Sequence, residues 1–288
     1  MKLKNKVAVI TGGNSGIGLG IAKEFKAEGA LLAIMGRNHQ TLDEAKQSLA
    51  IRDVNHPTLD EAQQSLAIRD DNHPTLDKAQ QHLGQDTLVV QGDVSKMADI
   101  DALYQTVMER LGKIDVLVVN AGIASFAPVE QTDEVAFDAM VNTNFKGAFF
   151  TIQKAINHLN DGASIILISS AAQSMGLPAT SVYTATKAAL RSLARTISAD
   201  LLYKKVRVNV ISPGPIDTPI FEKSGIPAEN LPQAKQELQR SVALNRFGTP
   251  KEVARVGVFL ASSDSSYIIG EEINVDGGAT NLKIVHAP

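Results

Sequence analysis

The chain has 288 residues, 44% hydrophobic and 20% charged, so it can bury a sizeable core, which argues against disorder. Its 28 Lys and Arg residues against 31 Asp and Glu give a net charge of −3, which leaves no basic excess to neutralise nucleic acid or an anionic membrane. The absence of cysteine excludes disulfides, thiolate metal sites and cysteine nucleophiles. The sequence lacks a signal core and an apolar run long enough to span a membrane. We therefore expect a soluble, cytoplasmic protein without nucleic-acid or membrane partners.

In chain order, the predicted strands alternate with amphipathic stretches, a pattern typical of a parallel sheet covered by helices on both faces. With right-handed crossovers, seven strands form a doubly wound, Rossmann-like α/β sheet whose ligand crevice lies at the carboxyl ends of the strands. We expect residues 1–288 to form a single dinucleotide-binding and catalytic domain. The predicted strands are Val7–Thr11, Leu31–Met35, Leu88–Gln91, Val116–Asn120, Ser164–Ser169, Val206–Ile211 and Glu272–Val275.

The first strand leads into a glycine-rich turn, Thr11-Gly12-Gly13-Asn14-Ser15-Gly16-Ile17-Gly18, and then a helical pattern. Gly12 permits a tight turn, while Gly16 and Gly18 allow close approach of a pyrophosphate at the helix N-terminus. The glycine spacing differs from G-x-G-x-x-G, and the lysine of a P-loop is missing. A ligand-free strand–helix turn is the alternative, but the position after the first strand favours a dinucleotide.

Arg37 and Asn38 follow the second strand, where an acidic residue would bind the ribose of NAD. A guanidinium pairs with a 2′-phosphate, so NADP is favoured and NAD stays possible. Arg52 and Arg69 hold the neighbouring position in repeated units, but only Arg37 directly follows the full apolar strand. Asp93, after the third strand, is a candidate for the adenine edge. Surface loop residues are the alternative interpretation of Arg37 and Asp93.

An internal repeat occupies residues 34–84, as three consecutive units of 17 residues. Each unit has Thr-Leu-Asp at an expected helix start, and the Asn-His pair before it is interpreted as a turn. Three brief units are too few for a solenoid. We expect two of them, about residues 51–84, to form a helical tandem-repeat insertion between the second and third strands. The repeated His39, His56 and His73 lack carboxylates at ligand spacing, so no metal site is predicted.

Tyr183 and Lys187 lie four residues apart in a predicted helix, Ala179–Leu202, and so share one face. An ordinary tyrosine titrates near pH 10, so acid–base work near neutrality requires a nearby ammonium group. Ser170 ends the preceding strand, and Asn144 lies in a helical segment after the fourth strand. A Tyr-x-x-x-Lys pair alone is a weak signal, and the other motifs in the sequence decide how it is interpreted.

The chain carries several further motifs, which follow one another in a fixed order. Thr11-Gly-x-x-x-Gly16-x-Gly18, Asn120-Ala121-Gly122, Asn144, Ser170, Tyr183-x-x-x-Lys187 and Pro213-Gly214 occur with thirteen residues from the serine to the tyrosine. Together they resemble the classical short-chain dehydrogenase/reductase family over essentially the whole chain apart from the repeats.

The resemblance implies a catalytic role for each of four residues. Tyr183 donates a proton to a substrate carbonyl oxygen in reduction and accepts it in oxidation. Lys187 stabilises the phenolate and holds the nicotinamide ribose. Ser170 orients the substrate oxygen, and Asn144 holds a water through which protons reach Lys187.

The resemblance also implies a cofactor site. Its residues are Thr11, Gly12, Asn14, Ser15, Gly16, Ile17, Gly18, Arg37, Asn38, Asp93, Val94, Asn120, Ala121, Gly122, Tyr183, Lys187, Pro213, Gly214, Ile216 and Thr218. Val119 stands where the family has a further asparagine, which removes one polar side chain. Acyl-carrier-protein ketoreductases commonly carry an arginine where Asn14-Ser15 stands, and enoyl reductases space their Tyr and Lys more widely, so neither role is assigned.

These motifs predict an NADP-dependent oxidoreductase that reduces a small-molecule ketone or aldehyde to an alcohol. The alternative is an NADP(H)-binding sensor or scaffold without turnover. The breaker-rich segment 216–247 is expected to be a substrate lid, with Phe221 and Leu231 in an apolar pocket wall. The family also implies a homotetramer packed through the Tyr183 helix and the C-terminal strand.

Overall fold

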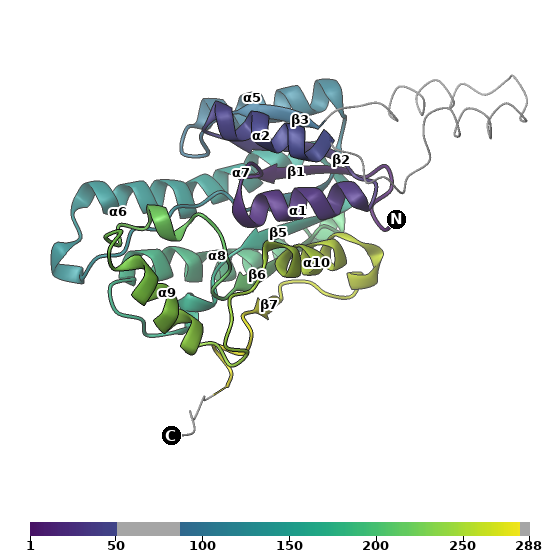
Figure 1. Cartoon of the computed structure of the whole chain (residues 1–288). Coiled ribbons are helices and arrows are strands. Elements are labelled where there is room, and N and C mark those ends of the chain that lie inside the picture. Colours follow the sequence, from purple (N-terminus) through teal and green to yellow (C-terminus); the bar gives the residue numbers. More distant parts are fainter. Residues whose placement is uncertain (51–86, 283–288) are drawn as a thin grey trace, which may run out of the picture.

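The computed structural model describes residues 1–50 and 87–282. Its strands form one parallel sheet in the order β3-β2-β1-β4-β5-β6-β7, which confirms the predicted fold class (Figure 1). The predicted insertion, about residues 51–84, lies outside the described residues together with Arg52, Arg69, His56 and His73, and it stays a prediction. So does the single domain over residues 1–288. The strands are β1 (Val7–Thr11), β2 (Leu31–Gly36), β3 (Leu88–Gln91), β4 (Ile114–Val119), β5 (Leu159–Ile168), β6 (Arg207–Pro213) and β7 (Glu272–Val275).

Helices cover both faces of the sheet and enclose two apolar cores. On one face, α1 (Gly16–Ala27), α2 (His39–Ala50) and α10 (Pro250–Ala261) supply one buried cluster. On the other, α5 (Met97–Arg110), α7 (Ala148–Ala155) and α8 (Ser181–Asp200) supply the second. The remaining helical segments are α6 (Glu134–Met140), α9 (Leu231–Arg240), the π-helix η2 (Val141–Gly147) and the short η1 (Val129–Gln131), η3 (Ile156–His158), η4 (Ala171–Ser174), η5 (Leu202–Lys204), η6 (Phe221–Lys223) and η7 (Ser263–Ser265).

The central strands β1 and β4 are mostly apolar because helices cover both faces of a parallel sheet, whereas the edge strand β7 also carries Glu272 and Asn274. All five residues of β1 are buried, for example. The structure departs from the predicted ends of four strands, β2, β4, β5 and β6. β5 begins at Leu159 instead of Ser164, beyond an irregular pairing with β4. β4 and β5 stop at Val119 and Ile168, so Asn120 and Ser170 lie just beyond the strands.

The first repeat unit fills the helix position after β2. Its helix α2 begins at His39, two residues before the expected Thr41, because the Asn38 side chain accepts a 3.0 Å hydrogen bond from the Thr41 backbone N–H. The Asn-His pair therefore starts a helix and is no turn here. The expectation that the repeated histidines lack a carboxylate partner is also wrong for His39, whose Nδ1 lies 2.8 Å from the Asp43 carboxylate.

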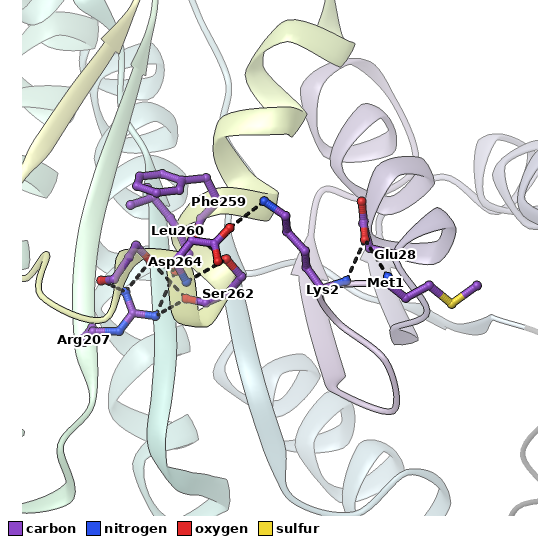
Figure 2. Close-up of polar contacts among 9 residues, drawn as sticks. Met1, Lys2, Glu28, Arg207, Phe259, Leu260, Ser262 and Asp264 are labelled. Carbon is purple, nitrogen blue, oxygen red and sulfur yellow. Dashed lines mark hydrogen bonds and ion pairs between the residues drawn. The ribbon is translucent and has the colours of Figure 1, made fainter.

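Arg207 joins β6 to the end of α10 (Figure 2). Its guanidinium donates to the carbonyl oxygens of Leu260, Ser262 and Ser265, and to the Ser265 hydroxyl, at 2.9–3.2 Å. Nearby, the Lys2 ammonium is 2.5 Å from the Asp264 carboxylate, which ties the N-terminal residues to the same corner. In the described part of the chain, no helix is long and apolar enough to cross a membrane.

Candidate active site

Asn120 holds the glycine turn against the end of β4. Its side-chain amide donates to the carbonyl oxygens of Thr11 and Gly12 at 3.0 and 3.1 Å. The Thr11 hydroxyl in turn accepts the backbone N–H groups of Asn120 and Ala121. These four bonds bring together two of the predicted cofactor motifs, the glycine turn and Asn120-Ala121-Gly122, at the carboxyl ends of adjacent strands.

The glycines of this turn leave space that a side chain would fill. Gly12 and Gly16 have positive φ values of 65° and 50°, which few other residues adopt without strain. A Cβ atom at Gly18 would overlap the carbonyl oxygen of Gly12. The first turn of α1, whose N–H groups have no partner within the helix, lies directly beyond. This cradle fits the pyrophosphate of a dinucleotide.

The segment after β6 covers the glycine turn. A Cβ atom at Gly16 would lie 3.3 Å from the Thr218 methyl group. Gly214 donates its N–H to Val275 at 3.0 Å and packs without a side chain against Asp276. Ile216 is buried and pairs with Gly248. The predicted residues from Pro213 to Thr218 therefore lie beside the glycine turn.

Arg37 and Asp93 lie together at the ends of β2 and β3. An Arg37 guanidinium nitrogen is 3.9 Å from the Asp93 carboxylate, with the Arg37 side chain 60% exposed. Gln91 donates to the Arg37 carbonyl oxygen at 3.0 Å, which fixes the backbone there. The adjacent Val94 is buried. The guanidinium is thus exposed and anchored at its base, as a group that binds an anion requires.

Asn14 connects the glycine turn to the start of α2. Its side-chain amide donates to the Thr41 hydroxyl at 2.6 Å, and Thr41 donates to the Asn38 carbonyl oxygen. The absence of a side chain at Gly36 makes room for Asn14. The sequence analysis missed this network, which fixes the backbone on both sides of Arg37.

Asn144 lies in the π-helix between α6 and α7 and is almost fully buried, at 1% exposure. Its side-chain oxygen accepts the Ile123 N–H at 2.8 Å, and its nitrogen donates to the Ile123 carbonyl at 2.9 Å and to the Thr186 hydroxyl at 3.2 Å. It therefore connects the π-helix to the loop after β4 and to α8. A π-turn re-aims side chains within an otherwise α-helical run.

Lys187 is buried on α8 and donates a 2.9 Å hydrogen bond to the carbonyl oxygen of Ile168. A Cβ atom at Gly122 would lie 3.3 Å from both the Lys187 Nζ and the Asn144 side-chain oxygen. The two groups thus face one small space. Burial lowers the pKa of Lys187 to about 8.

Tyr183 lies one helical turn before Lys187, and the ammonium group is 5.9 Å from its ring centroid. Burial raises the pKa of the Tyr183 phenol above its ordinary value, and a hydrogen bond with the Ser170 hydroxyl offsets this only in part. This differs from the expectation that the ammonium lowers the pKa toward neutrality. The physical reason is burial, which disfavours the charged phenolate. The phenol therefore holds its proton at neutral pH.

The segment predicted as a lid contains η6 and α9. Phe221 is 9% exposed and stacks edge-on against Phe247, with ring centroids 5.6 Å apart. Phe221, which was expected in an apolar pocket wall, therefore packs against another residue of the segment predicted as a lid. The aromatic side chain that meets Tyr183 is Phe126, which the sequence analysis did not single out. Within the described residues, no group of three or more His, Cys, Asp and Glu side chains could hold a metal.

Comparisons with known proteins agree with this geometry. A family model described as short chain dehydrogenase matches residues 6–60, and one described as Enoyl-(Acyl carrier protein) reductase matches residues 58–280. Oxidoreductase asL5 of Sarocladium schorii is 36% identical, over 98% of this chain and 98% of its own. Tetrahydroxynaphthalene reductase PfmaG of Pestalotiopsis fici is 31% identical, over 95% of this chain and 91% of its own.

Among solved structures, 3-ketoacyl-(acyl-carrier-protein) reductase from Brucella melitensis, complexed with NADH, has a TM-score of 0.78 and 26% identity. The match covers 96% of this chain and 99% of that one. The chain therefore belongs to the short-chain dehydrogenase/reductase family. It is an oxidoreductase of a family that uses NAD(P)(H).

Proposed function

We propose that this enzyme reversibly reduces a ketone or aldehyde to an alcohol, with Tyr183 as the general acid in reduction and the general base in oxidation. The observation that carries the proposal is the state of Tyr183. Its phenol, whose pKa is raised by burial, is hydrogen-bonded to Ser170 and lies one helical turn from the buried Lys187 ammonium. A protonated phenol is the form that reduction requires, because the new alkoxide must receive a proton.

In this proposal the Ser170 hydroxyl and the Tyr183 phenol both donate hydrogen bonds to the substrate carbonyl oxygen. These bonds draw electron density toward the oxygen and make the carbonyl carbon a better hydride acceptor. The bound cofactor supplies that hydride. As the carbon accepts it, the phenol proton moves to the oxygen, and the products are an alcohol and a Tyr183 phenolate.

Lys187 and Asn144 restore the proton of Tyr183. A positive charge one turn from Tyr183 stabilises the phenolate formed in reduction. The space faced by both the Lys187 ammonium and the Asn144 side-chain oxygen suits a water molecule that receives hydrogen bonds from one and donates to the other. Protons would reach Lys187 through that water.

NADPH is the proposed cofactor in preference to NADH. The glycine turn and the first turn of α1 would hold the pyrophosphate. Arg37, exposed and anchored at its carbonyl by Gln91, would pair with the 2′-phosphate, and Asp93 with Val94 would border the adenine. Proteins that bind NAD have an acidic residue at this strand end, which binds the free 2′-hydroxyl, whereas this chain has Arg37 there.

We further propose that the enzyme is a homotetramer, packed in part through α8 and β7. Exposed aromatic side chains support an interface near these elements. Tyr267, just before β7, is fully exposed, and Phe145 and Phe149 on η2 and α7 are 37% and 38% exposed. Large apolar side chains exposed together mark interaction surfaces.

The reductase proposal is tested by Tyr183→Phe, which removes the phenol oxygen alone. We expect carbonyl reduction to fall at least about a thousandfold, while the dissociation constant of NADPH, measured by fluorescence titration, changes less than about threefold. Tyr203→Phe is the matched control, since Tyr203 is 74% exposed on η5.

The assay follows NADPH oxidation over ketones, aldehydes, quinones, sugars and one enoyl thioester. Reduction of the enoyl thioester alone would replace carbonyl reduction with double-bond reduction. Tight NADPH binding without turnover of any compound would favour the sensor or scaffold. Wild-type rates in Tyr183→Phe would contradict the role of Tyr183.

A further inference from the structure

The loop after β4, residues 123–127, connects the catalytic residues to the lid. At one end, Asn144 holds both backbone polar groups of Ile123. At the other end, the Phe126 N–H donates to the Ser224 carbonyl oxygen at 2.9 Å, and the Ala127 N–H donates to that of Ala179 at 3.0 Å. The loop is therefore fixed to the π-helix, to the lid and to the segment before α8 at once.

The lid presents a rigid turn to this loop. Ser224 is fully buried, and its hydroxyl and N–H both bond to the Phe221 carbonyl oxygen. Gly225 has a φ of 85°, and a Cβ atom there would lie 3.8 Å from the Phe126 carbonyl oxygen. The turn at Ser224 and Gly225 therefore packs against the backbone of Phe126, and the hydrogen bond between Phe126 and Ser224 attaches the lid to the loop after β4.

The side chain of Phe126 meets the catalytic tyrosine. The Phe126 and Tyr183 rings lie edge to face, with centroids 5.7 Å apart and an interplanar angle of 82°. Such pairs contribute about 0.5–1.5 kcal/mol beyond their buried area. The ring of Phe126 therefore fixes the orientation of the phenol while its backbone holds the lid.

On the basis of the proposed reductase function, we propose that Phe126 is a positioning and selectivity residue of this site. It orients Tyr183, keeps water from the phenol and favours uncharged ketones that carry an apolar ring beside the carbonyl. Phe126 presents an apolar ring beside Tyr183, and on the lid Lys235 and Glu222 pair with each other at 2.9 Å. An ionised substituent against the Phe126 ring would lose its hydration without a partner, whereas an apolar ring would gain contact.

The two parts of the proposal have separate readouts. For selectivity, 1-tetralone serves as the ketone with an apolar ring beside the carbonyl and 2-butanone as the acyclic ketone, and each variant is compared with the wild type on the same ketone. For positioning, the absorbance of phenolate is measured as a function of pH. The same titration of a protein that also carries Tyr183→Phe is subtracted, so that the difference reports Tyr183 alone. The charged group that faces the Tyr183 ring from α8 is Lys187, and it is kept in every variant.

The wild-type enzyme is expected to prefer 1-tetralone. Phe126→Ala should raise KM for 1-tetralone about tenfold and change KM for 2-butanone less than about twofold. It should also lower the pH at which Tyr183 ionises, because water then reaches the phenol. Phe126→Leu keeps an apolar side chain but loses the ring. It should return the pH at which Tyr183 ionises to the wild-type value, and it should bring KM for 1-tetralone about halfway back to the wild-type value on a logarithmic scale.

Phe259→Leu is the control, because Phe259 packs into the core on the α10 side of the sheet and should leave all these quantities unchanged. Equal losses for both ketones, an unchanged Tyr183 ionisation in Phe126→Ala, or a wild-type preference for 2-butanone would overturn the proposal while leaving carbonyl reduction intact. Failure of the wild-type enzyme to reduce any carbonyl compound would overturn the proposed function and this proposal with it.

Discussion

The Lys187 ammonium donates a 2.9 Å hydrogen bond to the carbonyl oxygen of Ile168, the last residue of β5. A buried cation on α8 is thereby tied to the strand that leads to Ser170. The bond orients the charge, but it does not offset the free energy that the ammonium loses with its hydration, since burial lowers the Lys187 pKa to about 8. A residue that we propose to serve proton transfer therefore reduces the stability of the fold.

This cost predicts a pH dependence of stability. The unfolded chain holds this proton up to about pH 10.5, and the folded chain only up to about pH 8. Between these values the unfolded state binds more protons, so the free energy of unfolding rises with pH. Lys187→Met should remove this rise. Between pH 8 and pH 10 the free energy of unfolding of the wild type should therefore increase by about 2 kcal/mol relative to that of the variant. Urea unfolding measures it, and parallel curves for the two proteins would contradict it.

Arg37→Asp should move the cofactor preference from NADPH toward NADH. The change removes the partner of the 2′-phosphate and supplies an acceptor for the ribose hydroxyl. We expect the NADPH dissociation constant to rise about 30- to 100-fold and that of NADH to fall, both measured by fluorescence titration. Arg255→Asp, the same charge change at an exposed position of α10, should leave the ratio unchanged. A retained NADPH preference in Arg37→Asp would exclude Arg37 as the discriminating residue.

Asn144→Ala should lower both stability and turnover. Three hydrogen bonds to Ile123 and Thr186 are lost at a buried position, and two of them leave backbone groups of Ile123 without their partner. We expect a loss of about 2–4 kcal/mol of unfolding free energy and a reduced kcat. Thr186→Val removes one of the three bonds and should cost less than about 1.5 kcal/mol. Thermal unfolding and steady-state kinetics measure both, and equal effects of the two variants would exclude the role given to Ile123.

Deletion of residues 51–84 should leave a folded, active enzyme. The first repeat unit already supplies α2, whose Leu42, Ala45 and Leu49 are buried in the core, and residues 85–87 remain to connect α2 to β3. The deletion begins after Ala50, at the end of α2 away from Arg37, and rejoins the chain before the amino end of β3, so both the NADPH dissociation constant and kcat should stay close to the wild-type values. Circular dichroism, binding and kinetics on the deleted chain test this. A protein that does not fold would assign the repeats to the core.

The strands and the main site residues could be predicted because each is marked by local chemistry. A parallel strand that is covered on both faces needs an unbroken run of residues that can be buried, and β1, whose five residues are all buried, begins and ends as predicted. Positions such as Gly18 admit no side chain. By contrast, Asn160, Asp161 and Gly162 are turn residues by preference and lie in the irregular stretch between the paired residues Leu159 and Ser164, so the sequence pattern does not predict that β5 extends back to Leu159.

The parts that could not be predicted depend on contacts between distant segments. The start of α2 at His39 was missed because both Asn38 and Thr41 are good N-caps, and the hydrogen bond that decides between them is a matter of geometry. Phe126 carries no motif, and its position against Tyr183 follows from the lid and from Asn144. The spacing of Tyr183 and Lys187 likewise does not predict that the Lys187 ammonium bonds to the Ile168 carbonyl oxygen, or that burial raises the pKa of the Tyr183 phenol.

The attachment of α10 through Arg207 has a consequence for the response to salt. Its four hydrogen bonds end on uncharged oxygens in a half-buried place, so dissolved ions have little to screen. Lys2 and Asp264, in contrast, pair as exposed charges, and such pairs weaken as ionic strength increases. High salt should therefore loosen the N-terminal residues and leave α10 on the sheet, which hydrogen exchange would register as local fraying at one corner of an otherwise unchanged molecule.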